Sequence, residues 1–249
     1  MRIEDLLRAQ ARRMPERVAG VAGSRSVTFG ALEERAERLA RGLSAAGLRG
    51  GDRVIVALPN CLEFLDLIFA TARANLVLVP LNPRSTAAEF ARALADADAK
   101  AVVTTLRSGV LDGAAPAGVL VLEIDEEDEN GGSYSAFLAA EHAGPTCHAA
   151  GSELDPWLLA FTSGSTGKPK GVVLSHRAKY LSAVMEALDT ATTPVDVGLL
   201  NTPMFHVHGI VMALTLIAAG ARSRLRTTDD FREGVEAFHG KRKPRFNGS

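Results

Sequence analysis

The residues best suited to chemistry lie in one ten-residue segment, 162–171, which reads Thr-Ser-Gly-Ser-Thr-Gly-Lys-Pro-Lys-Gly. Four of its side chains carry hydroxyl groups, three of its residues are glycines and two are lysines. The segment therefore offers many N–H and O–H donors and two positive charges to one compact ligand. Phosphate groups combine acceptor oxygens with negative charge, so they are the ligands that this set fits best.

Each residue type in the segment has its own use. Gly164 and Gly167 let the backbone close on a ligand, because they lack a Cβ atom and tolerate positive φ. Lys168 and Lys170 supply charge for phosphate oxygens. The other side-chain donors are the hydroxyl groups of Thr162, Ser163, Ser165 and Thr166. A Ser- and Gly-rich surface turn is the alternative interpretation, but a plain turn has no need of two lysines and four hydroxyls in this order.

The segment is not the common mononucleotide P-loop. That motif has four residues between its glycines and a Ser or Thr directly after its lysine. Here two residues separate Gly164 from Gly167, and Pro169 follows Lys168. Because a proline disfavours the helical conformation at the residue before it, we expect a loop between two strands rather than a loop at a helix N-terminus.

The flanking residues predict the elements that hold this loop. Residues 157–161 form a continuous apolar run typical of a buried strand, and residues 171–175 predict a second strand. Trp157 is expected in the core rather than in a site. Ser175 is a preferred N-cap residue, so we expect His176 to begin a helix.

Two histidines, His206 and His208, form the second candidate group. On a strand, residues two apart point to the same face, which would allow both to bind a metal ion. No third ligand accompanies them in a recognisable pattern, so a metal site is disfavoured. An ordinary polar turn residue is the alternative for His206.

The wider pattern predicts the fold class. Between residues 27 and 225, short β-branched runs alternate with longer segments rich in alanine and leucine. This alternation predicts an α/β fold with mostly parallel sheets flanked by helices. Thr86 and Glu89 have capping-box spacing at the start of one helix, and Gly47 is placed to end another. Expected strands cover residues 53–58, 76–79, 101–104 and 119–124, and expected helices cover residues 32–43, 61–74, 87–97 and 209–221.

Composition excludes several classes of function. The 249 residues carry a net charge of −1, so there is no global positive field that would collect nucleic acid or an anionic membrane. The apolar segment 209–221 is too short to cross a bilayer, and we expect a buried helix there. Cys61 and Cys147 match no disulfide or metal pattern, and the first residues do not read as a secretory signal. We therefore expect a cytoplasmic protein, with the acidic run 125–129 as a solvated loop.

Residues 158–176, Leu-Leu-Ala-Phe-Thr-Ser-Gly-Ser-Thr-Gly-Lys-Pro-Lys-Gly-Val-Val-Leu-Ser-His, resemble the signature of adenylate-forming (AMP-binding) enzymes, particularly acyl-CoA synthetases. The segments 27–32, 72–83 and 203–209 agree with the family in order and spacing. The resemblance covers residues 1–231, which we expect to be part of an N-terminal AMP-binding domain. Residues 232–249 form a tail that does not match.

The resemblance implies a two-step ligase. A carboxylate attacks the α-phosphorus of ATP to give acyl-adenylate and pyrophosphate, and a thiol, usually of coenzyme A, then displaces AMP. It also implies that residues 162–170 hold the β- and γ-phosphates, with Thr162 near Mg²⁺ and with Lys168 or Lys170 neutralising the pyrophosphate. His206 corresponds to a position between the acyl and nucleotide sites, where it would orient the carboxylate.

The family's later motifs have no counterpart here. These are a Tyr-Gly-x-Thr-Glu element, a ribose-binding Gly-Asp and a lysine in a C-terminal domain. We interpret the chain as the N-terminal part of such an enzyme, truncated or frame-shifted, which we expect to self-associate through uncovered apolar surface. A non-catalytic polyphosphate-binding or interaction protein is the alternative. The acid is left open, since residues 205–209 resemble branches acting on malonate or oxalate as well as on fatty acids, and so is the choice between coenzyme A and a carrier-protein thiol.

Overall fold

The computed structural model describes residues 1–108, 111, 117–125, 128, 132–142, 151–162, 170–225, 233, 236–237 and 240–245. The helices are α1 (Ile3–Arg13), α2 (Phe29–Ala45), α3 (Leu62–Arg73), α4 (Ala87–Ala97), α5 (Gly132–Ala139), α6 (His176–Asp189) and α7 (Val207–Ala219). The strands are β1 (Val18–Ala22), β2 (Arg25–Thr28), β3 (Arg53–Ala57), β4 (Val77–Pro80), β5 (Ala99–Thr105), β6 (Leu120–Ile124), β7 (Pro156–Thr162), β8 (Lys170–Ser175), β9 (Val197–Leu200) and β10 (Arg222–Leu225).

The described strands form two sheets, which confirms the predicted α/β class. The larger sheet has the order β6-β5-β3-β4-β7-β8, and every neighbouring pair is parallel except β7 with β8. The smaller sheet has the order β2-β1-β10-β9, and only β1 with β2 is antiparallel. Because β10 lies between β1 and β9, the last described strand is internal to its sheet.

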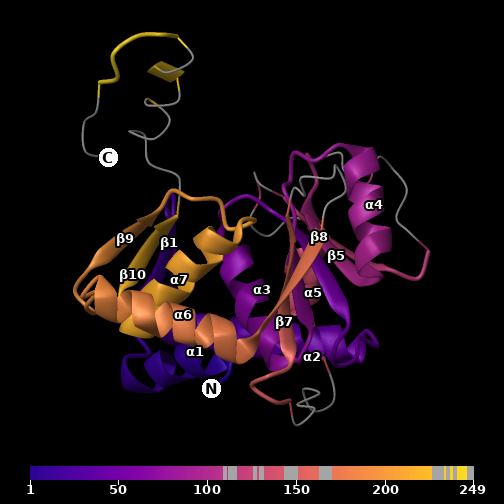
Figure 1. Cartoon of the computed structure of the whole chain (residues 1–249), viewed down its shortest axis with the longest axis horizontal. Coiled ribbons are helices and arrows are strands. Elements are labelled where there is room, and N and C mark those ends of the chain that lie inside the picture. Colours follow the sequence, from indigo (N-terminus) through magenta and orange to yellow (C-terminus); the bar gives the residue numbers. More distant parts are fainter. Residues whose placement is uncertain are drawn as a thin grey trace.

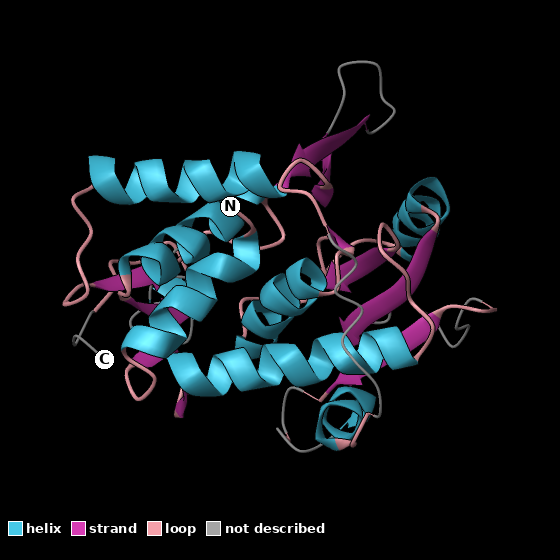
Figure 2. Ribbon diagram, turned by 90° about the horizontal axis from the view of Figure 1, so that it is seen from below, coloured by secondary structure: helices cyan, strands magenta, loops and turns pink. Residues whose placement is uncertain are grey.

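Helices fill the space between the two sheets. Helix α3 contacts β3 and β4 of the larger sheet and β1 of the smaller one, and Figure 1 shows it between them. Figure 2, seen from below, shows strands on both sides with helices between. The residues of α3 are buried along its whole length, and most of them are apolar.

The sequence of β3 does not alternate between apolar and polar residues, because both faces of the strand are buried. Val54 and Val56 join the main core between the sheets, whereas Ile55 and Ala57 join a second cluster with Phe90 of α4. The strand is covered on both faces, as is usual in parallel sheets. Its continuous apolar run is therefore required by burial.

Predicted helix ends are confirmed. The Thr86 side chain accepts from the Glu89 N–H, and the Glu89 carboxylate accepts from the Thr86 N–H, which completes the capping box of α4. Gly47 follows α2 with φ +96°. Ser175 caps α6 by accepting from the Ala178 N–H at 3.2 Å. The segment predicted as a buried helix at residues 209–221 is α7, and no helix in the described part of the chain is long and apolar enough to span a membrane.

A buried ion pair holds α2 against α3. Arg35 of α2 donates to both carboxylate oxygens of Asp66, at distances from 2.6 to 3.1 Å, and the Asp66 side chain has no exposed surface. The Tyr134 hydroxyl of α5 donates to the same carboxylate at 3.0 Å. Burial raises the pKa of the Asp66 carboxyl, and the charge of Arg35 acts against that rise. The polar groups of three helices thus meet on one carboxylate.

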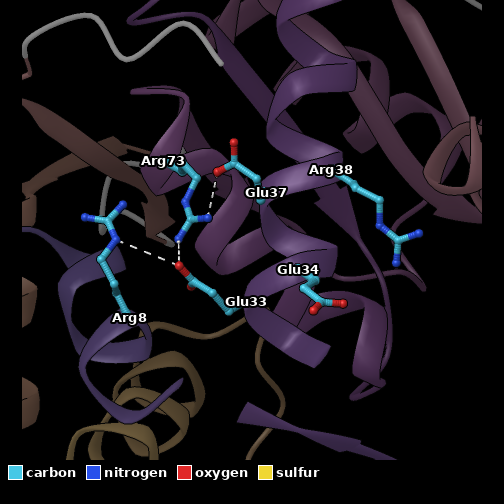
Figure 3. A pocket seen from close by; sticks show the side chains of 6 residues that line it. All are labelled: Arg8, Glu33, Glu34, Glu37, Arg38 and Arg73. Carbon is cyan, nitrogen blue, oxygen red and sulfur yellow. Dashed lines mark hydrogen bonds and ion pairs between the residues drawn. The ribbon is translucent and has the colours of Figure 1, made fainter. Parts of the chain in front are cut away.

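A second charged cluster joins α1, α2 and α3 (Figure 3). Arg73, whose side chain is 3% exposed, donates to Glu33 at 2.5 Å and to Glu37 at 2.8 Å. Arg8 of α1 lies 3.8 Å from the same Glu33 carboxylate. With Glu34 and Arg38, these residues line an open cavity of about 630 Å³. Its positive and negative side chains balance, so it has no strong preference for an anion.

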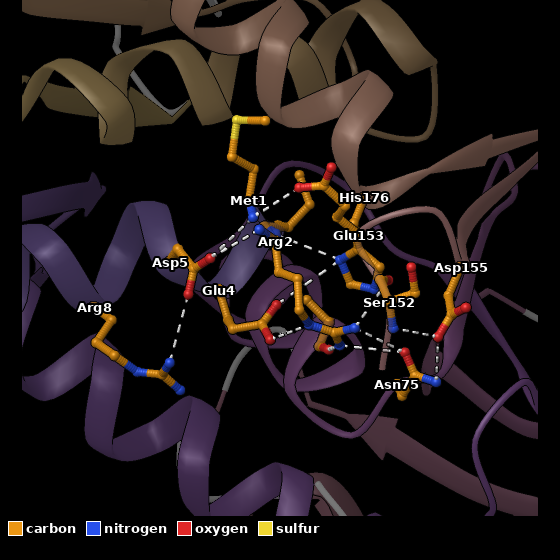
Figure 4. A network of polar contacts seen from close by, with 12 residues as sticks. Met1, Arg2, Glu4, Asp5, Arg8, Asn75, Ser152, Glu153, Asp155 and His176 are labelled. Atoms are coloured by element: carbon orange, nitrogen blue, oxygen red, sulfur yellow. Dashed lines mark hydrogen bonds and ion pairs between the residues drawn. The ribbon is translucent and has the colours of Figure 1, made fainter. Parts of the chain in front are cut away.

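A third polar network fastens α1 to the start of α6 (Figure 4). Arg2 donates to Glu4 at 2.6 Å and to the Ala72 carbonyl at 2.8 Å. The buried His176 accepts from the Ile3 N–H at 3.4 Å, and its ring lies 6.2 Å from that of Trp157. Burial, together with the Arg2 charge, lowers the pKa of His176 to about 3. Trp157 has no exposed surface, which confirms its place in the core.

Tyr134→Phe should lower the free energy of unfolding by about 1.5–3 kcal/mol, because it removes a buried hydrogen bond to a charged acceptor. Tyr180→Phe is the control, since Tyr180 is a partly buried tyrosine whose hydroxyl has no hydrogen bond within the described part of the chain. Urea denaturation of the two variants measures the difference. Equal effects would contradict the role given to the Asp66 contact.

His176 should make the protein less stable in acid. Its folded pKa of about 3 lies below the ordinary value of 6.5, so its stabilisation is complete above pH 6.5 and is lost as the pH falls from 6.5 toward 3. Between pH 7 and pH 5 this group alone should remove about 2 kcal/mol. Urea denaturation at both pH values should show a smaller loss for His176→Gln than for the unchanged chain, whereas the exposed His208→Gln should leave the loss unchanged.

Candidate active site

The predicted phosphate-binding segment lies between two strands, as expected. Thr162 is the last residue of β7, Lys170 is the first residue of β8, and the two strands pair antiparallel. Ser163, Gly164, Ser165, Thr166, Gly167 and Lys168 lie outside the described residues. Their proposed contacts with phosphate stay predictions.

The two ends of this segment are held side by side. Thr162 and Lys170 are paired across the ladder, and the Thr162 hydroxyl donates to the Lys170 carbonyl at 3.2 Å. Both residues are exposed. The pairing therefore fixes both ends of the predicted phosphate-binding segment at one end of β7.

The two strands that flank the segment differ in burial. Trp157 and Leu158 of β7 are fully buried, and Leu158 pairs with Leu78 of β4. Val172 and Val173 of β8 are 42% and 58% exposed. Strand β7 is thus anchored in the core, while β8 forms an edge of the larger sheet.

His206 lies at the start of α7, where it is the N-cap residue and is exposed. Its ring lies 4.6 Å from the Phe205 ring. His208 belongs to the first turn of the helix and not to a strand, so the two imidazoles do not share a face. The described residues contain no group of three or more His, Cys, Asp or Glu side chains that could hold a metal ion.

Asn60 brings the two candidate regions to one edge of the fold. It follows β3, and its side-chain amide binds the segment that begins at Leu200, the last residue of β9. Strand β3 lies parallel to β7 with β4 between them, about 10 Å away by the usual spacing of strands. Because β3, β4 and β7 are parallel, they end at the same edge of the larger sheet, and Asn60 holds the segment that leads to His206 at this edge. The carboxyl edge of a parallel sheet is where α/β proteins bind ligands.

The sequence predicted Thr162, Lys170 and His206 as site residues, but it gave Asn60 no role. The signal that could have been used is weak, because an asparagine after a strand is common in turns. Its partners lie 140 or more residues later in the chain.

The described cavities lie elsewhere. The cavity between α1, α2 and α3, and a second one of about 300 Å³ beside Arg25, Arg35 and Tyr134, contain none of the predicted site residues. Three arginines that line these cavities, Arg25, Arg35 and Arg73, are already paired with carboxylates. Their partners are Glu33, Glu37, Glu63 and Asp66. These two cavities are therefore weaker candidates for a nucleotide site than the ends of the strands.

Relatives of known activity are similar to this chain over most of its length. A feruloyl-CoA synthase of Amycolatopsis sp. is 34% identical over 217 residues, which cover 85% of this chain and 41% of that protein. An oxalate–CoA ligase of Arabidopsis thaliana is 30% identical, covering 92% of this chain and 46% of that protein. The chain spans less than half the length of these curated relatives.

Solved structures agree with the fold. The inhibitor-bound N-terminal domain of FACL13 from Mycobacterium tuberculosis has a TM-score of 0.78 at 29% identity, covering 97% of this chain and 61% of that one. ATP-bound MatB from Rhodopseudomonas palustris has a TM-score of 0.77 at 28% identity, covering 96% and 48%.

A family match completes the comparison. The description of the matched family is "AMP-binding enzyme", and the match covers residues 7–241. It begins in α1 and extends past β10, so it includes both sheets and the segments that carry Thr162, Lys170 and His206. The chain belongs to the AMP-binding enzyme family.

Proposed function

We propose that this chain supplies the phosphate-binding and carboxylate-orienting part of an AMP-forming acid–thiol ligase. The supporting observation is that β7, which leads into the 162–170 segment, ends at the same edge of the larger sheet as β3, and that Asn60 after β3 binds the segment leading to α7. Ferulate, oxalate and long-chain fatty acids are the candidate acids, because they appear in the names of similar ligases. Coenzyme A is the proposed thiol.

The proposed roles follow from the chemistry of the first step. A carboxylate oxygen of the acid forms a bond to the α-phosphorus of ATP, and the bond to the pyrophosphate oxygen breaks. Residues 162–170 would hold the β- and γ-phosphates, and Lys168 or Lys170 would neutralise the charge that the pyrophosphate gains. His206, which is exposed at the N-cap of α7, would orient the carboxylate.

Thr162, the one residue proposed as a Mg²⁺ ligand, lies among the described residues, and its hydroxyl oxygen suits this ion. The Thr162 hydroxyl donates a hydrogen bond to the Lys170 carbonyl, which leaves its oxygen lone pairs for a hard cation. Mg²⁺ bound to ATP would neutralise phosphate charge. We also propose a cytoplasmic location and a domain boundary at residue 231, followed by a separate tail at residues 232–249.

Carboxylate-dependent exchange of labelled pyrophosphate into ATP tests the proposed activity. We expect exchange with at least one of ferulate, oxalate or palmitate, and none when the acid is omitted. His206→Ala should lower the rate at subsaturating acid. Pyrophosphate binding without exchange for any acid would favour the alternative, a polyphosphate-binding protein that performs no turnover.

Lys168→Ala should weaken pyrophosphate binding by about 1.5–3 kcal/mol, because it removes a charge-assisted contact. Lys100→Ala is the matched control, since Lys100 is an exposed lysine of β5 that pairs with Asp98, away from the loop. Calorimetric titration with pyrophosphate compares the variants, and thermal melting should show little change for either. A loss of stability as large as the loss of binding would make the loop structural.

The isolated chain should self-associate at micromolar concentration. Apolar side chains are exposed on the edge strands β8 and β9 and on α6, and open strand edges are prone to pairing. These residues are Val172, Val173, Leu181, Met185, Leu188, Val197 and Leu199. Light scattering measures the mass. Val173→Lys and Leu199→Lys together should reduce association, whereas a clean monomer in the unchanged chain would contradict the prediction.

A further inference from the structure

Asn60 makes three hydrogen bonds to one short segment far along the chain. Its Nδ2 donates to the Leu200 carbonyl at 2.9 Å and to the Thr202 carbonyl at 3.0 Å. Its Oδ1 accepts from the Met204 N–H at 2.7 Å. Asn60 is partly buried. Leu200 is the last residue of β9, and Thr202 and Met204 belong to the connection between β9 and α7.

The partners require an asparagine. Two carbonyl oxygens need two N–H donors and one backbone N–H needs an acceptor, and a side-chain amide provides both at once. An aspartate would place a carboxylate oxygen against the two carbonyls. A glutamine carries the same groups, but they are one methylene farther from the backbone. The contact therefore depends on both the chemistry and the length of this side chain.

The segment that Asn60 binds leads directly to His206. Met204 is fully buried, and the His206 N–H donates to the Pro203 carbonyl at 3.0 Å. A Cβ atom on Gly209 would lie 2.3 Å from that same carbonyl oxygen, so only glycine fits there. Residues 203–209 thus form a close turn, whose position is set by the anchor at its start.

We infer that Asn60 is a positioning residue that fixes His206 relative to the ends of the larger sheet. The Asn60 amide extends from the end of β3 in one sheet to the end of β9 in the other, and the exposed imidazole of His206 follows two residues after Met204. The functional consequence, an acid held in line with the nucleotide, rests on the role proposed for His206. The positional claim does not.

NMR of the His206 imidazole tests the positional claim directly. The Phe205 ring lies 4.6 Å from this imidazole, so its ring current makes the Hε1 and Cε1 shifts sensitive to the turn. Asn60→Ala should change these shifts, and so should Gly209→Ala, which disturbs the turn from its other end. Asn201→Ala is the matched control, because Asn201 lies in the same segment and its side chain has no hydrogen bond within the described residues.

Carboxylate-dependent pyrophosphate exchange tests the functional consequence. Asn60→Ala should lower kcat/KM for the acid by about 10–100-fold through misplacement, while pyrophosphate affinity stays unchanged. In a His206→Ala background, Asn60→Ala should cause no further loss, because the two residues act through one contact. A residue that only stabilised the fold would give independent, multiplying losses.

The outcomes separate the two claims. Unchanged His206 shifts in Asn60→Ala would overturn the inference, whatever the activity. Changed shifts without exchange for any acid would support the positioning and count against the proposed ligase. Should Asn60→Ala fail to fold, Asn60→Gln retains the donors and acceptor, and it must still move the His206 shifts if the length of the side chain sets the turn. Wild-type shifts in Asn60→Gln would overturn the inference as well.

Discussion

The candidate site depends on the contact between the carboxyl ends of strands in two separate sheets. Each sheet by itself presents only part of the required chemistry, with Thr162 at the end of β7 in one and His206 beyond the end of β9 in the other. The Asn60 amide joins the end of β3, which lies in the same sheet as β7, to the end of β9 by hydrogen bonds to Leu200, Thr202 and Met204. Backbone carbonyls removed from water need hydrogen-bond donors. The Asn60 amide supplies such donors to the irregular segment before α7, in addition to linking the two sheets.

The layers behind this edge are held by apolar burial and by polar contacts of defined geometry. Helix α3 packs against both sheets, and its Asp66 and Arg73 bind side chains of α2. A buried carboxylate or guanidinium is costly unless it is paired, so these contacts select one arrangement of the helices. The His176 network does the same for α1 and α6. The position of the strand ends follows from this rigid interior.

Most of the arginine charge discussed above is neutralised inside the fold. The net charge is −1, and Arg25, Arg35 and Arg73 bind carboxylates within the fold. Lys170, at the end of the loop, is exposed and has no carboxylate partner among the described residues. A protein without a global positive field can therefore still carry an unpaired positive charge at one end of this loop.

The sequence by itself determined the elements and the chemistry of the loop. The apolar run of β7, the Thr86 cap and the glycine after α2 act through contacts between residues close in the chain, so they can be recognised without a structure. His208 shows the limit, because its spacing from His206 suggested a shared face that the helical turn removes. Only the tertiary structure decided that Asn60 holds the segment before His206. That contact joins residues 140 or more positions apart, and no local pattern encodes which distant carbonyls a turn asparagine will meet.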